Sequence, residues 1–149
     1  MTIPPTGRVL GLDWGTSRIG VAISDETQLV ARPLDVLTRR TGRRLPLSQF
    51  LTIVTRETPV GLVVGLPLDD DGRIGDSAAA AREMGLSFAT RTYLPVEWVD
   101  ESFTSAHSIQ TMIEMGRRPT KQNVDPLAAA TLLQEWLDGR EREKEKKRE

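Results

Sequence analysis

The sequence contains no cysteine and a single histidine among its 149 residues. The absence of cysteine excludes disulfides, thiolate metal sites and cysteine nucleophiles. A single histidine likewise excludes a zinc site built from several histidines. No stretch reaches the apolar length of a membrane span, and no secretory signal leads the chain. We therefore expect a cytoplasmic protein that has no membrane partner.

The sequence also lacks a strong net charge, since its formal net charge is −1. Nucleic-acid binders are often basic, so the total charge gives no support for that function. Two local basic clusters are present: Arg39, Arg40, Arg43 and Arg44, and Arg117, Arg118 and Lys121. The second cluster predicts either a track for phosphate groups or a solvated basic loop.

Length and composition indicate one soluble domain. The chain is 38% hydrophobic and 28% charged, which is ordinary for a globular protein with one core. We expect residues 1–138 to form that domain. The almost purely charged residues 139–149 are expected to form a flexible tail or to prolong the last helix through opposite-charge pairs.

The pattern of apolar residues predicts five strands. Short β-rich runs at 8–13 and 19–25 flank a glycine turn and predict a hairpin, and residues 29–37 form a third extended stretch. The continuous apolar run at 60–68 fits a strand buried on both faces. Residues 95–99 are another short strand.

Helical spacing of apolar residues predicts four helices. The first places Leu47, Phe50, Leu51 and Val54 on one face, and it ends at Thr58 because a residue before proline avoids the helical region. The others are marked by Ala81, Met84, Gly85 and Phe88, by residues 109–116 and by residues 129–137. This order predicts an α/β fold whose mixed central sheet, an antiparallel three-strand meander plus parallel strands, is flanked by helices.

Asp13 ends the first predicted strand, in the segment VLGLDWGTSRIGVAISD of residues 9–25. One interpretation is a turn, because aspartate readily bonds the backbone two residues further on. The other is a ligand position, because Asp13 shares a strand face with Val9 and Gly11 and so extends a buried row.

Two further acids, Asp100 and Glu101, follow the last predicted strand. Open α/β sheets place their ligands at the carboxyl ends of strands, although acids are also favoured at the start of a helix. Alternation points the two side chains to opposite faces, so only one of them can enter a shared site.

Asp125 precedes a proline, and this pair is typical of a helix N-cap and first turn. Asp125 also lies four residues before Ala129 and seven before Leu132, on the stripe expected to pack against the sheet. Acids at the ends of three elements fit Mg²⁺, which takes hard oxygen ligands. Two such ions can activate a water and stabilise the leaving oxygen of a phosphodiester.

Five ordered segments resemble the YqgF family of bacterial pre-16S rRNA nucleases, which are also described as Holliday-junction-resolvase-like. The segments are GLDWGTSRIGVAISD, ARPLDVL, VVGLPLDDDG, VDESFTS and VDPLAAATLLQEWL. The resemblance covers nearly the whole chain and implies an RNase H-like fold and a nuclease that depends on Mg²⁺ or Mn²⁺. It implies catalytic and metal-binding roles for Asp13, Glu101 and Asp125, and Glu101 is preferred to Asp100 on this ground alone.

The chain departs from the family pattern at two places. Asp69 stands where the family often has asparagine, and SFTS follows Glu101 where an arginine-leucine pair is commoner. Both changes bear on phosphate binding rather than on the fold.

Several residues near these acids have two interpretations each. Gly15 would let the turn approach a metal or a phosphate, and Thr16 and Ser17 would bind a phosphate oxygen or stabilise the turn. Trp14 would stack a base or pack in the core. His107 is expected at the surface or in edge packing.

The predicted function is a metal-dependent endonuclease that hydrolyses phosphodiester bonds in 5′-end maturation of pre-16S rRNA. The alternatives are a Holliday-junction resolvase acting on branched DNA and a non-catalytic nucleic-acid-binding factor of ribosome assembly. A sugar-kinase-like or actin-like ATPase is disfavoured, because 149 residues leave no room for a second lobe. We expect structured RNA or branched DNA as the partner, and a monomer or homodimer.

Overall fold

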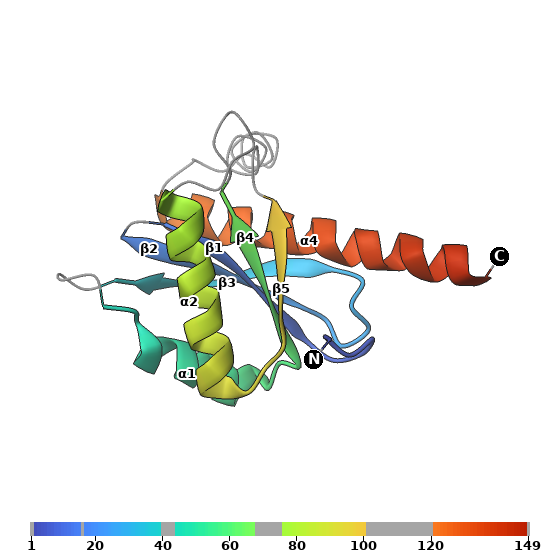
Figure 1. Cartoon of the computed structure of the whole chain (residues 1–149), viewed down its shortest axis with the longest axis horizontal. Helices are drawn as coiled ribbons and strands as arrows, with labels where there is room; N and C mark the ends of the chain where they lie inside the picture. The colour runs from blue at the N-terminus through green and yellow to red at the C-terminus, as the bar shows by residue number, and fades with distance from the viewer. Residues whose placement is uncertain (1, 16, 40–43, 68–75, 101–120, 149) are drawn as a thin grey trace.

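The computed structural model describes residues 2–15, 17–39, 44–67, 76–100 and 121–148 (Figure 1). In chain order its elements are β1 Val9–Trp14, β2 Arg18–Ser24, β3 Ala31–Thr38, α1 Leu47–Glu57, β4 Gly61–Leu66, α2 Asp76–Thr92, β5 Val96–Asp100 and α4 Lys121–Arg148. Each predicted strand is confirmed. The helix predicted at 109–116 lies outside the described residues.

The strands form one sheet in the order β3-β2-β1-β4-β5. β1, β2 and β3 are antiparallel neighbours, whereas β4 runs parallel to both β1 and β5. The predicted meander with added parallel strands is therefore confirmed. Because β1, β4 and β5 run in one direction, their carboxyl ends lie at the same edge of the sheet.

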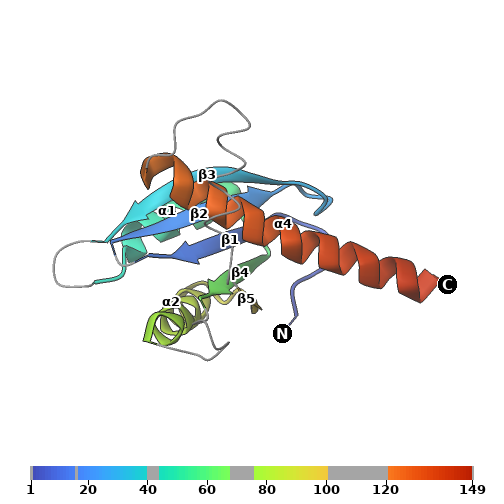
Figure 2. The same cartoon turned by 90° about the horizontal axis from the view of Figure 1, so that it is seen from above.

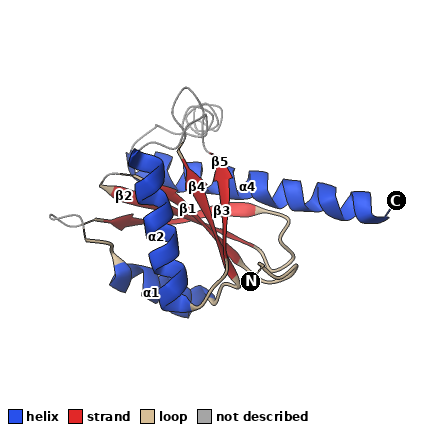
Figure 3. Ribbon diagram, in the orientation of Figure 1, coloured by secondary structure: helices blue, strands red, loops and turns tan. Residues whose placement is uncertain are grey.

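Helices cover both faces of the sheet (Figures 2 and 3). On one face α1 and α2 enclose a core that includes Leu10, Leu12, Ile19, Phe50 and Phe88. On the other face α4 lies over a second core that includes Val9, Ala22, Val63, Ala129 and Leu133. Successive strand residues alternate between these two cores, as the pleat requires.

α4 lies directly on β1 because Gly11 has no side chain. A Cβ atom at Gly11 would stand 2.8 Å from the Cβ of Leu133 and 3.1 Å from the carbonyl oxygen of Ala129. Gly85 of α2 serves the same purpose on the opposite face, where a Cβ would meet the Trp98 ring at 2.9 Å. Both helices are thus seated on the sheet through glycines.

α1 is confirmed, but the prediction that Leu51 lies on its packed face is wrong. Leu51 is 37% exposed, whereas Phe50 and Ile53 are buried. Packing against the sheet selects the stripe through Ile53 and leaves Leu51 at its margin. The helix ends as predicted, since Thr58 takes a left-handed conformation with φ of 47° and its N–H bonds to the Val54 carbonyl oxygen.

α4 begins at Lys121, so the interpretation of Asp125 as an N-cap is wrong. Asp125 lies inside the helix and is followed by Pro126, the sixth helical residue, which has no N–H to donate to the helical ladder. The helix continues through the charged segment to Arg148. Of the two predictions for this segment, a flexible tail or a longer last helix, the structure has the longer helix. The division into a domain at 1–138 and a separate tail stays a prediction.

Candidate functional site

Asp13 is the fifth residue of β1, where it lies opposite Gly20 in the ladder with β2. It belongs to the same strand face as Val9 and Gly11, both of which are buried under α4. The Asp13 side chain is itself half-buried. The carboxylate therefore extends a buried row, as predicted, and it stands within the strand rather than in the turn that follows.

The contacts of α4 fix its direction across β1. Beside the chain segment that leads into β1, the guanidinium of Arg140 donates to the carbonyl oxygen of Pro4 at 3.2 Å. Further along β1, Gly11 meets the backbone of Ala129. The helix therefore approaches the carboxyl end of β1 as its residue numbers decrease. Figure 1 shows the other end of α4 projecting beyond the sheet.

The start of α4 reaches the level of Asp13. From the contact between Gly11 and Ala129, Asp125 lies four residues back along the helix, which is about 6 Å. Asp13 lies two residues on along the strand, which is about 7 Å. The backbone of Asp125 therefore stands over the same face of the sheet and near the same edge as Asp13. The side chain of Asp125 lies outside the described residues.

β5 settles which face Asp100 occupies. Trp98 packs with the core under α1 and α2, whereas Val99 packs with the core under α4. The Trp136 indole of α4 donates to the Glu97 carboxylate at 3.4 Å, so Glu97 also faces α4. By alternation Asp100 lies on the face of Trp98, opposite to that of Asp13. Glu101, the next residue, lies outside the described residues.

Of the three predicted metal ligands, Asp13 is the one whose side chain lies among the described residues. Among them, no group of three or more His, Cys, Asp or Glu is placed to hold a metal ion. Glu101 and the side chain of Asp125 are not among these residues. The half-buried carboxylate of Asp13 is a hard oxygen donor of the kind that Mg²⁺ and Mn²⁺ prefer, so it fits a divalent ion.

Asp25 is a turn residue that the sequence interpretation passed over. One carboxylate oxygen accepts the N–H groups of Leu29 and Val30, each at 2.9 Å, and the other accepts the N–H and the hydroxyl of Thr27. These hydrogen bonds, that of the Thr27 hydroxyl foremost, lower the pKa of Asp25 from 3.8 to about 2. Asp25 thus closes the connection between β2 and β3.

Trp14 and Gly15 have structural roles next to Asp13. Trp14 packs partly against the core under α1 and α2, and the guanidinium carbon of Arg39 lies 4.2 Å from its ring centroid. Core packing of Trp14 is therefore confirmed. A Cβ at Gly15 would lie 2.5 Å from the Arg18 carbonyl oxygen, so closure of the turn itself requires glycine.

The remaining predicted residues fall into two groups. Ser17 is exposed, and Lys121 begins α4 but its side chain is not described. The following residues lie outside the described residues: Thr16, Arg40, Arg43, Asp69, His107, Arg117 and Arg118.

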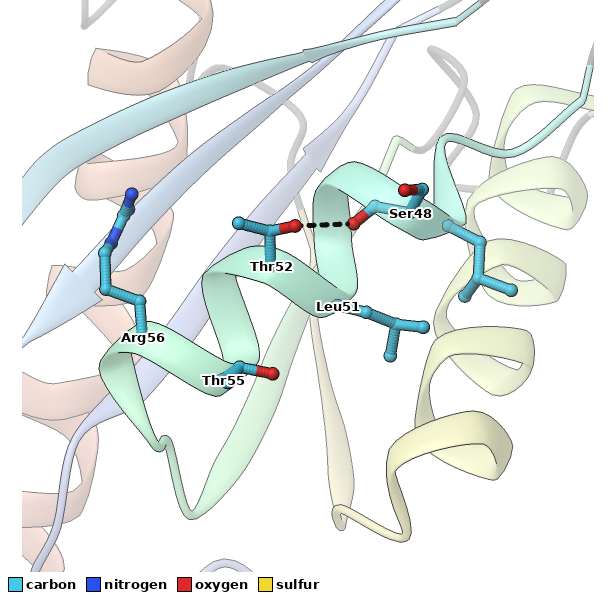
Figure 4. A pocket seen from close by; sticks show the side chains of 6 residues that line it. Ser48, Leu51, Thr52, Thr55 and Arg56 are labelled. Carbon is cyan, nitrogen blue, oxygen red and sulfur yellow. Dashed lines mark hydrogen bonds between the residues drawn. The ribbon is translucent and has the colours of Figure 1, made fainter.

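A shallow pocket runs along α1 and is separate from Asp13 (Figure 4). It is lined by Leu47, Ser48, Leu51, Thr52, Thr55 and Arg56. The Thr52 hydroxyl donates to the Ser48 carbonyl oxygen at 3.0 Å. None of these described lining residues is an acid, and the helix covers the face of the sheet opposite to Asp13, so we do not assign the pocket to the candidate site.

Comparison with known proteins identifies the family. The profile of the family described as "RuvX: Holliday junction resolvase" matches residues 7–139. The chain belongs to the RuvX family.

Relatives of this RuvX chain match over most of its length. A protein of Anaeromyxobacter sp. (strain Fw109-5) named "Putative pre-16S rRNA nuclease" is 43% identical over 136 residues, which cover 89% of this chain and 98% of the relative. A protein of the same name from Roseiflexus sp. (strain RS-1) is 36% identical over 134 residues, which cover 89% and 94%. The resemblance recognised in the sequence is therefore confirmed.

Solved structures confirm the fold. The structure described as "T. thermophilus RuvC in complex with Holliday junction substrate" has a TM-score of 0.57 and 18% identity, and the match covers 89% of this chain and 94% of that one. The yeast mitochondrial Holliday junction resolvase Ydc2 has a TM-score of 0.51 and 13% identity, with 91% and 80% covered. The RuvX chain thus has the RNase H-like fold. Within its described residues, no helix is both long and apolar enough to cross a membrane.

Proposed function

We propose that this RuvX-family chain is a divalent-metal-dependent endonuclease that hydrolyses phosphodiester bonds in precursor 16S rRNA. The observation that carries the proposal is the position of Asp13. Its carboxylate lies on the α4 face of the sheet, at the edge where β1, β4 and β5 end and where α4 begins. Ligands of open α/β sheets bind at such an edge.

Asp13, Glu101 and Asp125 are the proposed catalytic residues and ligands of Mg²⁺ or Mn²⁺. The half-buried carboxylate of Asp13 and the course of α4 support two of these roles. The third role, that of Glu101, rests on the resemblance to the family, and its neighbour Asp100 lies on the face of the sheet opposite to Asp13. Ions of this kind, when bound, activate water and stabilise the leaving oxygen of a phosphodiester.

The names of the relatives favour RNA as the substrate, and the structural likeness favours a second candidate. Relatives at 43% and 36% identity are named for precursor rRNA. The RuvC structure was solved with a Holliday junction, so cleavage of branched DNA by the same site is the alternative. Maturation of precursor rRNA would place the protein in the cytoplasm. We expect the protein to be a monomer or homodimer.

The test of this proposal compares isosteric variants of four acids. Purified D13N, E101Q and D125N are incubated with precursor 16S rRNA and Mg²⁺ or Mn²⁺, and D100N serves as the matched control. We expect cleavage by the wild type and by D100N, and loss of cleavage in the other three variants. Metal-dependent cleavage by D13N at the wild-type rate would refute the assignment.

A second arm separates the substrates. The same proteins are given a four-way DNA junction beside the precursor RNA, at equal concentration and salt. Faster cleavage of the RNA supports the proposal, and faster cleavage of the junction supports the resolvase. A non-catalytic assembly factor would instead show normal ribosome maturation in cells that carry alanine at all three acids.

A further inference from the structure

Arg18, the first residue of β2, carries a buried donor that the described part of the chain does not satisfy. Its Nη1 atom is buried, and no described residue accepts a hydrogen bond from it. The ion pairs found among the described residues all involve Glu57, and Arg18 takes part in none of them. Because a guanidinium carries five N–H donors and no acceptor, this group is suited to a ligand that brings several acceptor oxygens.

Arg18 lies on the same face of the sheet as Asp13. Ile19 and Val21 pack in the core under α1 and α2, so alternation puts Arg18 and Gly20 on the α4 face. Asp13 stands opposite Gly20 in the ladder, which makes Arg18 its diagonal neighbour. Diagonal pairs on one face of an antiparallel ladder are about 7–8 Å apart, within reach of a long side chain.

This position complements the acids of the proposed site. The carboxylates of the proposed site carry charge of the same sign as a phosphodiester, so a nearby arginine, together with the bound ion, favours the approach of the strand. An arginine side chain matches phosphate geometry with two parallel hydrogen bonds, which a lysine cannot reproduce. The guanidinium of Arg39 is not part of this arrangement, because it lies over the Trp14 ring, which packs with the core on the opposite face.

Asp35, another described acid near Arg18, is engaged elsewhere. Asp35 of β3 lines the same shallow hollow as Arg18. Its carboxylate accepts the N–H of Val36 at 2.7 Å, and it stands opposite Val21 in the ladder. Asp35 therefore belongs to a different row of the sheet and forms no ion pair with Arg18.

We propose that Arg18 is a phosphate-binding residue that grips the nucleic-acid backbone beside the phosphodiester held at Asp13. The inference rests on the proposed function, which it deepens by naming a substrate contact. The ligand is a nucleic-acid phosphate, a chemistry that RNA and DNA share.

The test measures binding rather than cleavage. In a D13N background, the affinities of R18Q and R18K for a precursor-rRNA stem and for a four-way DNA junction are measured by fluorescence anisotropy over a series of KCl concentrations. We expect R18Q to bind about tenfold more weakly and to lower the slope of log K against log[salt] by about 1, the contribution of one phosphate contact. R18K should keep the slope and bind with intermediate affinity, because it keeps the charge without the two-pronged geometry.

R32Q is the matched control, because it removes the same charge from β3. Arg32 stands opposite Ile23, at the far end of the strand from Arg18. We expect R32Q to leave both the affinity and the salt slope unchanged. Equal loss of slope in R32Q and R18Q would overturn the inference, since it would show diffuse attraction rather than a contact.

A neutral methylphosphonate placed at single backbone positions then locates the contact. In the D13N background, one position should weaken binding when Arg18 is present and have no effect in R18Q. A wild-type salt slope in R18Q, together with a lower melting temperature, would overturn the inference and assign Arg18 to a partner within the chain. This failure is distinct from the failure of the proposed function. The proposed function fails if variants of the three acids still cleave the precursor RNA.

Discussion

Asp13 and Asp25 belong to the same opening segment, each lies near the end of an apolar strand, and yet the fold uses them differently. Asp25 lies in the connection between β2 and β3, where its carboxylate accepts backbone N–H groups from Thr27, Leu29 and Val30. Asp13 lies inside the ladder, opposite Gly20, on a face that is otherwise buried under α4. One acid completes a turn, and the other is carried by the sheet itself.

The difference teaches that the face of the strand, rather than the residue type, separates a turn acid from a candidate ligand. Asp25 follows its strand and bonds forward into the loop, which lowers its pKa to about 2. Asp13 continues the row of Val9 and Gly11 and is directed by the pleat toward the start of α4. The following predictions test this contrast, from the largest expected effect to the smallest.

The largest expected difference is in cleavage. D13N should lower the rate of cleavage of precursor rRNA by at least about a hundredfold, because loss of even an outer partner of a metal ligand typically costs 10- to 100-fold. D25N should stay within about twofold of the wild type. Initial rates at saturating Mg²⁺ measure both, and equal losses in the two variants would remove the distinction between the two acids.

The close packing of α4 on β1 at Gly11 can be disrupted without a change to any acid. G11A places a Cβ within 2.8 Å of the Leu133 Cβ, and such overpacking should cost about 1–3 kcal/mol of unfolding free energy. Because the start of α4 would shift relative to Asp13, cleavage should fall as well. Urea denaturation and initial rates measure the two effects.

G139A is the matched control for G11A. A Cβ at Gly139 meets no atom closer than 3.9 Å, so this exchange in the same helix should stabilise the protein by about 0.5–1 kcal/mol. Cleavage should not change. A loss of stability in G139A similar to that in G11A would show that the contact at Gly11 is not what seats the helix.

The contribution of Asp25 to the unfolding free energy should depend on pH. The folded-state pKa of Asp25 lies below its ordinary value of 3.8, so its contribution is fully present above about pH 4 and is lost as pH falls toward 2. D25N should therefore be less stable than the wild type at neutral pH by about 1 kcal/mol, a modest value because the carboxylate is exposed. Urea unfolding of both proteins between pH 2 and 7 checks that this gap narrows only at the acid end.

Most of the sheet could be predicted because its strands have simple patterns. Alternation and the glycine turn indicate the β1–β2 hairpin, and the continuous apolar run indicates β4, which is flanked by strands on both sides. Helical spacing likewise predicts α2 and the apolar part of α4. These signals are local, so no tertiary contact is needed to recognise them.

The errors arose where tertiary packing decides. Leu51 and Ile53 offer two possible stripes on α1, and contact with the sheet selects Ile53. The sequence around Asp125 resembles a cap, but α4 begins four residues earlier. In the site, alternation alone could not show which face Asp100 occupies until Val99 and Trp98 were assigned to their cores. Arg18 was missed because no local pattern shows which arginine has a buried donor.

The central claim, that Asp13 shares a divalent ion with Glu101 and Asp125, is tested most directly by a crystal soaked in Mn²⁺. Anomalous scattering locates the ion without reference to activity. The account predicts a peak about 2.1 Å from a carboxylate oxygen of Asp13, with oxygens of the other two acids in the same coordination sphere. A fully occupied peak elsewhere, beside Asp100 or Asp25, with none at Asp13, would contradict it.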